Sequence, residues 1–164
     1  MARSRGSPLT GRSPSRGETG VGRGARVVLS RTPPPKPDLE RLEIHRSADR
    51  ALLEHVEISQ IARGNFQSAY LGYAIGAEHR GQGYMTEALQ LALRHAFLTL
   101  RLHRVEANAE PGNESSLALV RRAGFSREGF SRRYLKIRGR WRDHERWALL
   151  AEDWRPSQPS RRAS

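Results

Sequence analysis

Apolar and polar side chains alternate along several short segments of the chain, as they do in β-strands that bury one face. Five segments show this alternation and are predicted strands: residues 55–61, 68–75, 104–109, 134–137 and 146–150. The first two flank Arg63-Gly64-Asn65, and the last two flank Arg138-Gly139-Arg140. Short connections that contain glycine or asparagine are typical of hairpins, so we expect each of these pairs to form one.

Two further segments space their apolar side chains three and four residues apart, which is typical of helices that bury one side. The first begins after Gly83, and the second begins after Pro111-Gly112-Asn113 and ends near Gly124. Residues 39–54 also show helix-like spacing among many charges. The order strand–strand–helix–strand–helix–strand–strand predicts an α+β fold, in which the two central helices cross over between neighbouring strands.

Neither pattern extends through the two ends of the chain. Residues 1–38 hold six of the nine prolines and few apolar residues, so little offsets the entropy cost of ordering them. We therefore expect a disordered leader over residues 1–38, a folded domain over residues 39–154 and a disordered tail over residues 155–164. The alternative for the leader is that Ala25 to Leu29 adds a strand to the edge of the sheet.

Charge and cysteine content limit the classes of function. The net charge is +12, but seven arginines, one lysine and one glutamate put +7 of it in residues 1–37. The charge therefore does not show that the folded part binds nucleic acid. The absence of cysteine excludes disulfides, thiol catalysis and Cys-ligated metal sites. No apolar stretch suits a transmembrane helix and the start lacks the apolar region of a secretory signal, so we expect a cytoplasmic protein.

The segment with the most chemical information is His79-Arg80-Gly81-Gln82-Gly83-Tyr84-Met85-Thr86-Glu87. Glycines let the backbone approach a ligand closely, and the helix that follows directs its unpaired N–H groups and positive dipole end to the same place. This combination binds phosphate or pyrophosphate. A P-loop is excluded because Gly-x4-Gly-Lys-Ser/Thr is absent. The alternative is a plain glycine-rich entry to a helix.

Four segments in this order resemble the GNAT acetyltransferases: SAYLGYAI, HRGQGYMTEAL, HRVEANAEPGNESSLALVRRAGF and RRYLKIRGRWRDHERWAL. Within that family they are similar to the RimJ/RimL type, which acetylate protein N-termini, notably those of ribosomal proteins. Arg80-x-x-Gly83-x-Met85 matches the Arg/Gln-x-x-Gly-x-Gly/Ala loop of the family except at its last position. The resemblance implies the GNAT fold, which is a mixed, mostly antiparallel sheet with two crossover helices.

The resemblance runs from about His55 to Trp154 and leaves the beginning of the domain unaccounted for. A complete domain of this type starts with a strand and two helices that wall the acceptor site. Here residues 1–37 do not resemble that part, so only residues 39–54 are available to form it before His55. We therefore expect a GNAT domain truncated at its N-terminus. An unpaired strand edge and an uncovered apolar face would be left behind.

The resemblance also implies that the chain binds acetyl-CoA. The pyrophosphate would lie on the glycine loop, and the pantetheine arm would follow the strand before it into a gap beside residues 105–109. A backbone N–H near Ala74 or Ile75 would polarise the thioester carbonyl. Asn113 and Ser116 match the family's Asn-x-x-Ser near the cofactor sulfur, although both also suit a helix N-cap. The residues expected to bind the cofactor are Tyr73, Ala74, Ile75, Arg80, Gly81, Gln82, Gly83, Tyr84, Met85, Asn113 and Ser116.

Members of the family transfer the acetyl group directly to an amine, which requires a base. Glu106 is the first candidate because it is the only carboxylate within the strand beside the gap. The alternative is that Glu106 pairs with Arg104 or Arg122 on a solvated face. Asn108 shares its side of the strand and could bind the acceptor backbone or a water, and Glu110 is a weaker candidate.

The leaving thiolate requires a proton donor. In several relatives this donor is a tyrosine of the second helix, but this chain has Val120 at that place. Ser116 or water is therefore the expected donor. The histidines lack the spacing of metal ligands, and no metal is expected.

Together these features predict an acetyl-CoA-dependent N-acetyltransferase whose acceptor is the N-terminal amine of a protein, such as a ribosomal protein. No membrane partner is expected, and contact with nucleic acid is expected only as non-specific binding by the basic tails. One alternative is a remnant that binds CoA without turnover. The other is a basic protein associated with RNA or the ribosome that uses both arginine-rich tails. Residues 127–142, with seven basic side chains and one acid, are typical of a solvated hairpin face, and the alternatives are contact with the 3′-phosphate of the cofactor, with an acidic acceptor or with ribosomal RNA.

Overall fold

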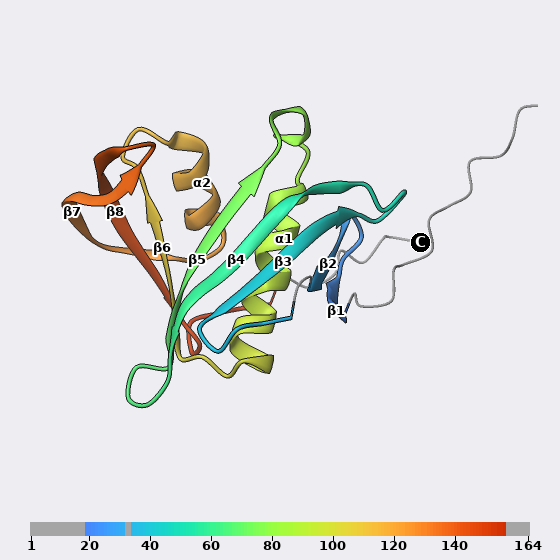
Figure 1. The fold of residues 1–164 in the computed structure, drawn as a ribbon, viewed down its shortest axis with the longest axis horizontal. Coiled ribbons are helices and arrows are strands. Elements are labelled where there is room, and N and C mark those ends of the chain that lie inside the picture. The colour runs from blue at the N-terminus through green and yellow to red at the C-terminus, as the bar shows by residue number, and fades with distance from the viewer. Residues whose placement is uncertain (1–18, 32–33, 157–164) are drawn as a thin grey trace, which may run out of the picture.

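Eight strands form one sheet in the computed structural model, which describes residues 19–31 and 34–156 (Figure 1). The strands are β1 (Thr19–Arg23), β2 (Val27–Arg31), β3 (Leu39–Arg46), β4 (Leu52–Ala62), β5 (Ser68–Ile75), β6 (Arg104–Ala109), β7 (Ser126–Ile137) and β8 (Arg140–Leu150). Their order across the sheet is β1-β2-β3-β4-β5-β6-β8-β7. All neighbouring pairs are antiparallel except β5 and β6, which are parallel.

Two α-helices make the crossovers. Helix α1 (Tyr84–Arg94) follows a 3-10 turn at Ala77–His79 and continues into a π-helical turn at His95–Thr99. Helix α2 (Glu114–Arg122) connects β6 to β7. This arrangement confirms the predicted α+β class, with its mixed, mostly antiparallel sheet and two crossover helices.

The central strands lie where alternation predicted them. β5 and β6 have the predicted bounds, and β4 includes the predicted residues 55–61. β7 and β8 both begin earlier than predicted. The sequence pattern missed their first halves because these residues are mostly exposed and show no apolar alternation. Pairing between the two strands, from Ser126–Ala148 to Ile137–Arg140, extends the hairpin through these polar residues.

The prediction of helical structure over residues 39–54 is wrong. β3 and the beginning of β4 occupy this segment and are joined by a turn. Leu42 and Ile44 are fully buried, and Leu42 lies opposite Val56 in the sheet. The helix-like spacing arose because apolar residues of two separate strands were read as one series. Pairing with β4 decides the structure of this segment.

The prediction of a disordered leader is wrong for residues 19–31. β1 and β2 form a hairpin there, and β2 pairs with β3 from Val27–Arg46 to Arg31–Leu42. Val27 and Leu29 are fully buried. The observed arrangement is the alternative one, in which this segment adds strands to the sheet, so the edge of β3 is paired rather than open. The disorder predicted for residues 1–18, 32–33 and 157–164 concerns positions outside the described residues.

The hydrophobic core lies between the sheet and the two helices. Ala88, Leu89, Ala92 and Leu93 of α1 are fully buried, and α1 contacts β1 to β4. In Figure 1 it lies behind β3 and β4. Helix α2 contacts β6 on the same side of the sheet. The opposite face of β3 and β4 presents polar side chains, and none of the described helices covers it. We call this surface the polar face of the sheet.

A buried ionic cluster fixes the leader strands to the core. Glu40 of β3 has a side chain that is only 7% exposed, and its Oε2 lies 3.2 Å from Arg31 of β2 and 2.8 Å from Nε2 of His95. His95 begins the π-helical turn after α1 and is also buried. One carboxylate therefore joins β2, β3 and the end of α1. A buried carboxylate is tolerated at this core position because two cationic or polar partners satisfy it.

Replacing Glu40 by alanine should lower the free energy of unfolding by about 3 kcal/mol or more, because Arg31 and His95 would lose their buried partner. Urea denaturation of the full chain measures this change. Glu54→Ala is the matched control, since Glu54 also binds a histidine, His55, but its side chain is 44% exposed. A surface pair of that kind contributes about 1 kcal/mol at most. Equal losses in the two variants would contradict a special role for the buried cluster.

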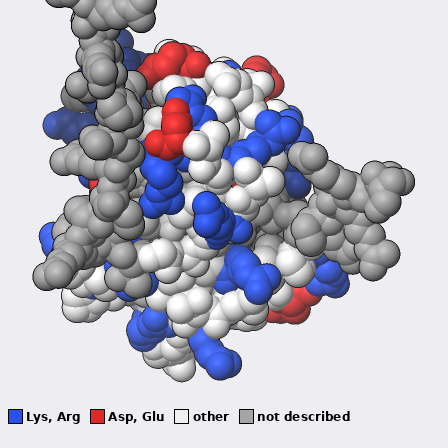
Figure 2. Space-filling view, turned by 90° about the vertical axis from the view of Figure 1, so that its right-hand side faces the viewer, with Lys and Arg blue, Asp and Glu red and all other residues white. Residues whose placement is uncertain are grey.

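Positive charge is concentrated at the end of the molecule that carries β1, β2 and the turn between β3 and β4. Lys and Arg side chains clearly outnumber acidic ones on the face shown in Figure 2, which is the right-hand side of Figure 1. Among the exposed or partly exposed residues of these elements are Arg23, Arg26, Arg46 and Arg50. The N-terminus of α1, where the sequence predicts anion binding, is adjacent to this end through contacts with the β1–β2 hairpin.

Candidate active site

The glycine loop between β5 and α1 has the backbone geometry of an anion site. Gly81 and Gly83 have φ angles of +73° and +78°, a region in which other residues are strained. Gly83 is the N-cap of α1, and its carbonyl accepts the first helical hydrogen bond, from Glu87 N at 3.2 Å. The N–H groups of the first helical turn therefore lack helical acceptors and are available to an anion.

β5 and β6 diverge immediately beside this loop. They pair only through Ser68–Arg104, Ala69–Val105 and Tyr70–Glu106. Beyond Tyr70, β5 continues to Ile75 and β6 continues to Ala109 without pairing to each other. The gap expected between these two strands is therefore present, with Tyr70 and Glu106 at its closed end. Tyr73, Ala74 and Ile75, which were predicted to bind the cofactor, form one side of it.

Two hydroxyl groups meet across the gap on the helix side of the sheet. Tyr73 lies opposite Val56 and so shares the face covered by the helices. Its hydroxyl lies 2.6 Å from Oγ of Ser116, in the first turn of α2. Burial raises the pKa of Tyr73, and the hydrogen bond with Ser116 partly opposes that effect. The pair is therefore a neutral source of a proton between β5 and α2.

Asn113 positions this end of α2. Its Oδ1 accepts hydrogen bonds from Ser116 N at 3.2 Å and from Ser115 Oγ at 3.1 Å. The expected N-cap role of the Asn-x-x-Ser segment is thus observed. The cap holds Ser116 where it meets Tyr73, so both residues stand beside the gap. The meeting of Tyr73 and Ser116 was not predicted, because it joins residues 43 positions apart.

Glu106 lies on the polar face at the closed end of the gap. Its Oε1 accepts a hydrogen bond from Arg104 Nε at 2.7 Å, so the alternative pairing with Arg104 is observed. Arg104 also binds Glu128. Tyr70 adjoins Glu106, and its pKa is raised by the hydroxyl of Tyr134 at 3.5 Å, by burial and by the charge of Glu106. Glu106 is thus a carboxylate with one cationic partner and one tyrosine, Tyr70, beside it.

Asn108 follows Glu106 on the same side of β6, where β6 has already separated from β5. Its Oδ1 is buried and has no hydrogen-bond partner among the described residues. Buried polar atoms in folded proteins nearly always have a partner, so an orphaned oxygen of this kind is a candidate contact for a ligand. Asn108 is therefore placed to accept a hydrogen bond from a molecule in the gap.

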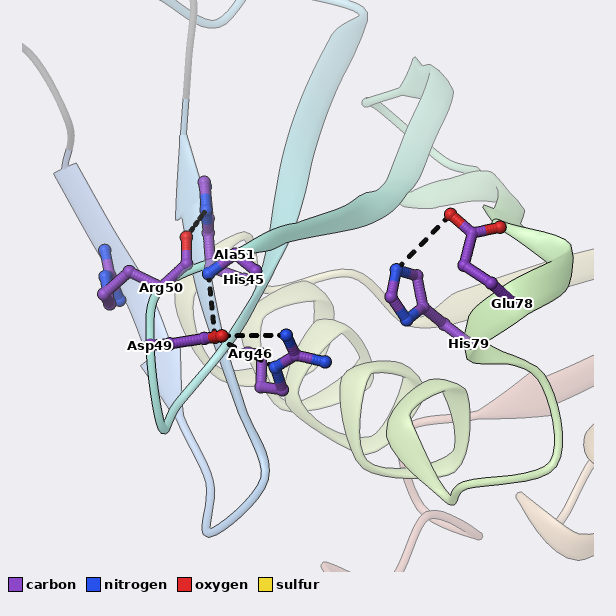
Figure 3. Close-up of polar contacts among 7 residues, drawn as sticks. All are labelled: His45, Arg46, Asp49, Arg50, Ala51, Glu78 and His79. Atoms are coloured by element: carbon purple, nitrogen blue, oxygen red, sulfur yellow. Dashed lines mark hydrogen bonds and ion pairs between the residues drawn. The ribbon is translucent and has the colours of Figure 1, made fainter. Parts of the chain in front are cut away.

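Cationic side chains surround the glycine loop. Arg46, at the end of β3, forms two hydrogen bonds with Asp49, at 2.9 and 2.8 Å (Figure 3). It also interacts with the hydroxyl of Tyr84. The guanidinium lowers the pKa of Asp49 to about 2 and so keeps its charge paired. His79 Nε2 lies 3.5 Å from Oε1 of Glu78 (Figure 3). Arg80 is exposed and extended, with no ion pair among the described residues.

Glu87 connects the loop to the leader hairpin, a role that the sequence did not suggest. Its carboxylate accepts hydrogen bonds from three consecutive backbone N–H groups of the β1–β2 turn: Ala25 at 3.0 Å, Arg26 at 2.7 Å and Val27 at 2.7 Å. A side chain at Gly24 would collide with the same carboxylate, since its Cβ would overlap Glu87 Cδ. The first turn of α1 therefore fixes the turn of the hairpin.

Replacing Glu87 by glutamine should loosen the hairpin, because hydrogen bonds to a charged acceptor contribute about 1.5–3 kcal/mol each and a neutral amide accepts more weakly. We expect a lower free energy of unfolding and faster hydrogen exchange at Val27. Glu114→Gln is the matched control, since Glu114 also lies in the first turn of a helix but is exposed. Unchanged exchange at Val27 in Glu87→Gln would show that strand pairing alone holds β2.

Two further observations concern the described part of the chain. It contains no group of three or more His, Asp or Glu side chains placed to hold a metal ion. Its helices are too short or too polar to cross a membrane.

Comparison with known proteins assigns the family. Residues 39–126, over half of the chain, match the acetyltransferase (GNAT) domain. The chain is 42% identical over 110 residues to the probable N-acetyltransferase YjcK of Bacillus subtilis (strain 168), covering 67% of this chain and 61% of the relative. It is 42% identical over 108 residues to ribosomal protein uS5-alanine N-acetyltransferase of Escherichia coli (strain K12), covering 66% and 56%.

Solved structures agree with this assignment. The fold is similar to that of Mycobacterium smegmatis RimJ in complex with CoA-disulfide, with a TM-score of 0.67 and 35% identity over 70% of this chain and 54% of that one. The chain spans less than two thirds of the length of each of these relatives. The chain belongs to the GNAT acetyltransferase family.

Proposed function

We propose that this protein is an acetyl-CoA-dependent N-acetyltransferase that acts in the cytoplasm on the N-terminal amine of a protein of the ribosomal type. The observation that supports this proposal most is the gap between β5 and β6 next to the glycine loop. Candidate proton-transfer groups lie at the gap on both faces of the sheet: Glu106 on the polar face, and Tyr73 with Ser116 on the helix side. One similar protein is named ribosomal protein uS5-alanine N-acetyltransferase, and another is named RimJ. The acceptor of this chain is inferred from that similarity.

The residues around the loop and the gap fit acetyl-CoA. The unpaired N–H groups from Gly81 to Met85 suit its pyrophosphate. The unpaired edge of β5 from Leu71 to Ile75 suits the amide groups of its pantetheine arm, which can hydrogen-bond to a strand edge as another strand would. When bound, acetyl-CoA supplies a thioester as the acetyl donor. Asn113 and Ser116 lie on the other side of the gap and would contact the cofactor there.

Residues on the two sides of the sheet would serve the two proton transfers. The polar face presents Glu106 and Asn108, and the helix side presents Tyr73 with Ser116. A protein α-ammonium has a pKa of about 7.7–8.0, so a carboxylate acting directly or through a water can deprotonate it. Glu106 would take this proton while Asn108 holds the acceptor. The Ser116 hydroxyl, backed by Tyr73, would protonate the departing thiolate, and an N–H of Ala74 or Ile75 would stabilise the oxyanion.

The polar face also suits a cationic acceptor. Tyr70, at the closed end of the gap, lies opposite both Ser59 and Glu106 in the sheet, so these residues share one face. Glu57 lies opposite Gly72 and therefore belongs to the same face, closer to the open end. Carboxylates along this surface would attract a positively charged N-terminus.

Calorimetry with acetyl-CoA, followed by a thiol-release assay with short peptides, tests the proposal. The protein should release CoA thiol from acetyl-CoA when it is given peptides with a free N-terminus. It should not do so with the same peptides when the N-terminus is blocked and only a lysine amine is free. Absence of acetyl-CoA binding would refute the proposed function. Thiol release that depends on lysine rather than on the N-terminus would refute the proposed acceptor.

A CoA-binding remnant without turnover remains the second candidate, and one observation favours it. None of the described helices covers the polar face where the acceptor would sit. This candidate predicts tight acetyl-CoA binding with no thiol release above the rate without protein. The two candidates therefore differ in one measurement, which is turnover with a bound cofactor.

A further inference from the structure

The β1–β2 turn contributes a cation to the glycine loop from outside the segment that matches the family. The family match begins at residue 39, whereas this turn is formed by residues 24–26. Its backbone is held by Glu87, the fourth residue of α1, through the three hydrogen bonds described above. The position of the turn relative to the loop is therefore fixed by contacts that do not involve a ligand.

Arg26 extends from this turn over the loop. Its Nη1 donates a hydrogen bond to the carbonyl of Gln82 at 3.2 Å. Its Nε lies 3.7 Å from the place that a Cβ of Gly83 would occupy, so the guanidinium stands beside the N-cap of α1. The side chain is exposed, and it forms no ion pair with any of the described residues. One side of a guanidinium is thus anchored while its other donors remain available.

Arg26 differs in this respect from the neighbouring Arg46. The charge of Arg46 is matched by Asp49 through two hydrogen bonds. Glu87, in contrast, binds the backbone of the Arg26 turn and is occupied by three N–H groups. The unmatched charge of Arg26 adds to the positive end of the α1 dipole. A guanidinium presents several donors in a plane and is well suited to two oxygens of one phosphate group.

We propose that Arg26 is a ligand for the pyrophosphate of acetyl-CoA. This inference rests on the proposed function, because it requires that acetyl-CoA binds at the glycine loop. The hairpin of residues 19–31 then has a second role besides closing the sheet edge, since it completes the phosphate site. A side chain that is already held by Gln82 loses little freedom on binding, so its contribution to affinity is larger than that of a mobile surface arginine.

The test compares Arg26→Ala with Arg23→Ala in the full chain. Arg23 is an exposed arginine of the same hairpin, so both variants lose one positive charge at the same end of the molecule. Calorimetry measures the affinity for acetyl-CoA, for its analogue without the 3′-phosphate and for S-acetylpantetheine, which has neither phosphate group. We expect Arg26→Ala to weaken the first two ligands about tenfold and to leave the third unchanged. Arg23→Ala should alter each affinity less than about twofold, and Arg26→Lys should recover part of the loss.

Several results would overturn this inference. Equal losses in Arg26→Ala and Arg23→Ala would mean that only net charge matters. A loss that also affects S-acetylpantetheine, or a lower thermal midpoint of Arg26→Ala, would mean that Arg26 acts by holding the loop. A loss of affinity for acetyl-CoA alone, without a loss for the analogue that lacks the 3′-phosphate, would mean that Arg26 binds the 3′-phosphate and not the pyrophosphate. Failure of the unaltered protein to bind acetyl-CoA would instead refute the proposed function, which separates the two cases.

Discussion

Replacing Gly83 by aspartate should abolish acetyl-CoA binding, with an affinity at least about 100-fold lower. Gly83 has a φ of +78° and is the N-cap of α1, so any side chain there is strained and lies at the proposed phosphate site. Unit charges about 4 Å apart repel by about 4 kcal/mol at an effective dielectric of about 20. The new carboxylate would also lie near Arg26, whose guanidinium is 3.8 Å from the Cβ position. It would then compete with the cofactor for this cation.

Two variants separate the causes of that loss. Gly83→Ala introduces the backbone strain, about 1–2 kcal/mol, without a charge. Gly139→Asp introduces strain and charge at a second glycine with φ +78°, in the turn between β7 and β8, where a Cβ meets no atom within 4 Å. Calorimetry of Gly139→Asp should match the unaltered protein. Full affinity in a folded Gly83→Asp variant would remove the glycine loop from the cofactor site.

The elements that sequence patterns predicted correctly are those whose signal is local. β5 and β6 alternate apolar and polar residues within their own length, and α1 places its four buried residues at helical spacing. The glycine loop was equally readable, because two glycines directly before a helix specify its backbone geometry. The pairing of Glu106 with Arg104 was also among the predicted alternatives, since the two residues are neighbours on one side of β6.

The elements that sequence patterns missed depend on partners far along the chain. β3 has a carboxylate, Glu40, at a buried position, which is tolerated because Arg31 and His95, 55 residues away, both bind it. β2 contains only a short apolar segment. Two long-range interactions stabilise it: its pairing with β3, and the hydrogen bond from Val27 to Glu87, which is 60 residues away. Composition suggested disorder there because proline and arginine dominate the residues around it. Long-range contacts of this kind leave no pattern in a single sequence.

If Glu106 is the general base, Glu106→Gln should lower kcat by about 10²–10⁴ with little change in the affinity for acetyl-CoA. The glutamine keeps the shape of the side chain and can still accept a hydrogen bond from Arg104 but cannot accept a proton. Single-turnover thiol release, measured with a peptide that has a free N-terminus, reports the chemical step.

Glu128→Gln distinguishes this role from a structural one, because Glu128 binds the same arginine from β7. Arg104 lowers the pKa of Glu128, so that carboxylate remains charged and its loss removes a comparable ion pair. Glu128 is not at the closed end of the gap, where Tyr70 and Glu106 are paired in register. If Glu106 only neutralises Arg104, the two variants should lower kcat and stability alike. If Glu106 is the base, only Glu106→Gln should lose turnover, while both variants keep their affinity for acetyl-CoA. Full activity in Glu106→Gln would leave a water held by Asn108 as the proton acceptor.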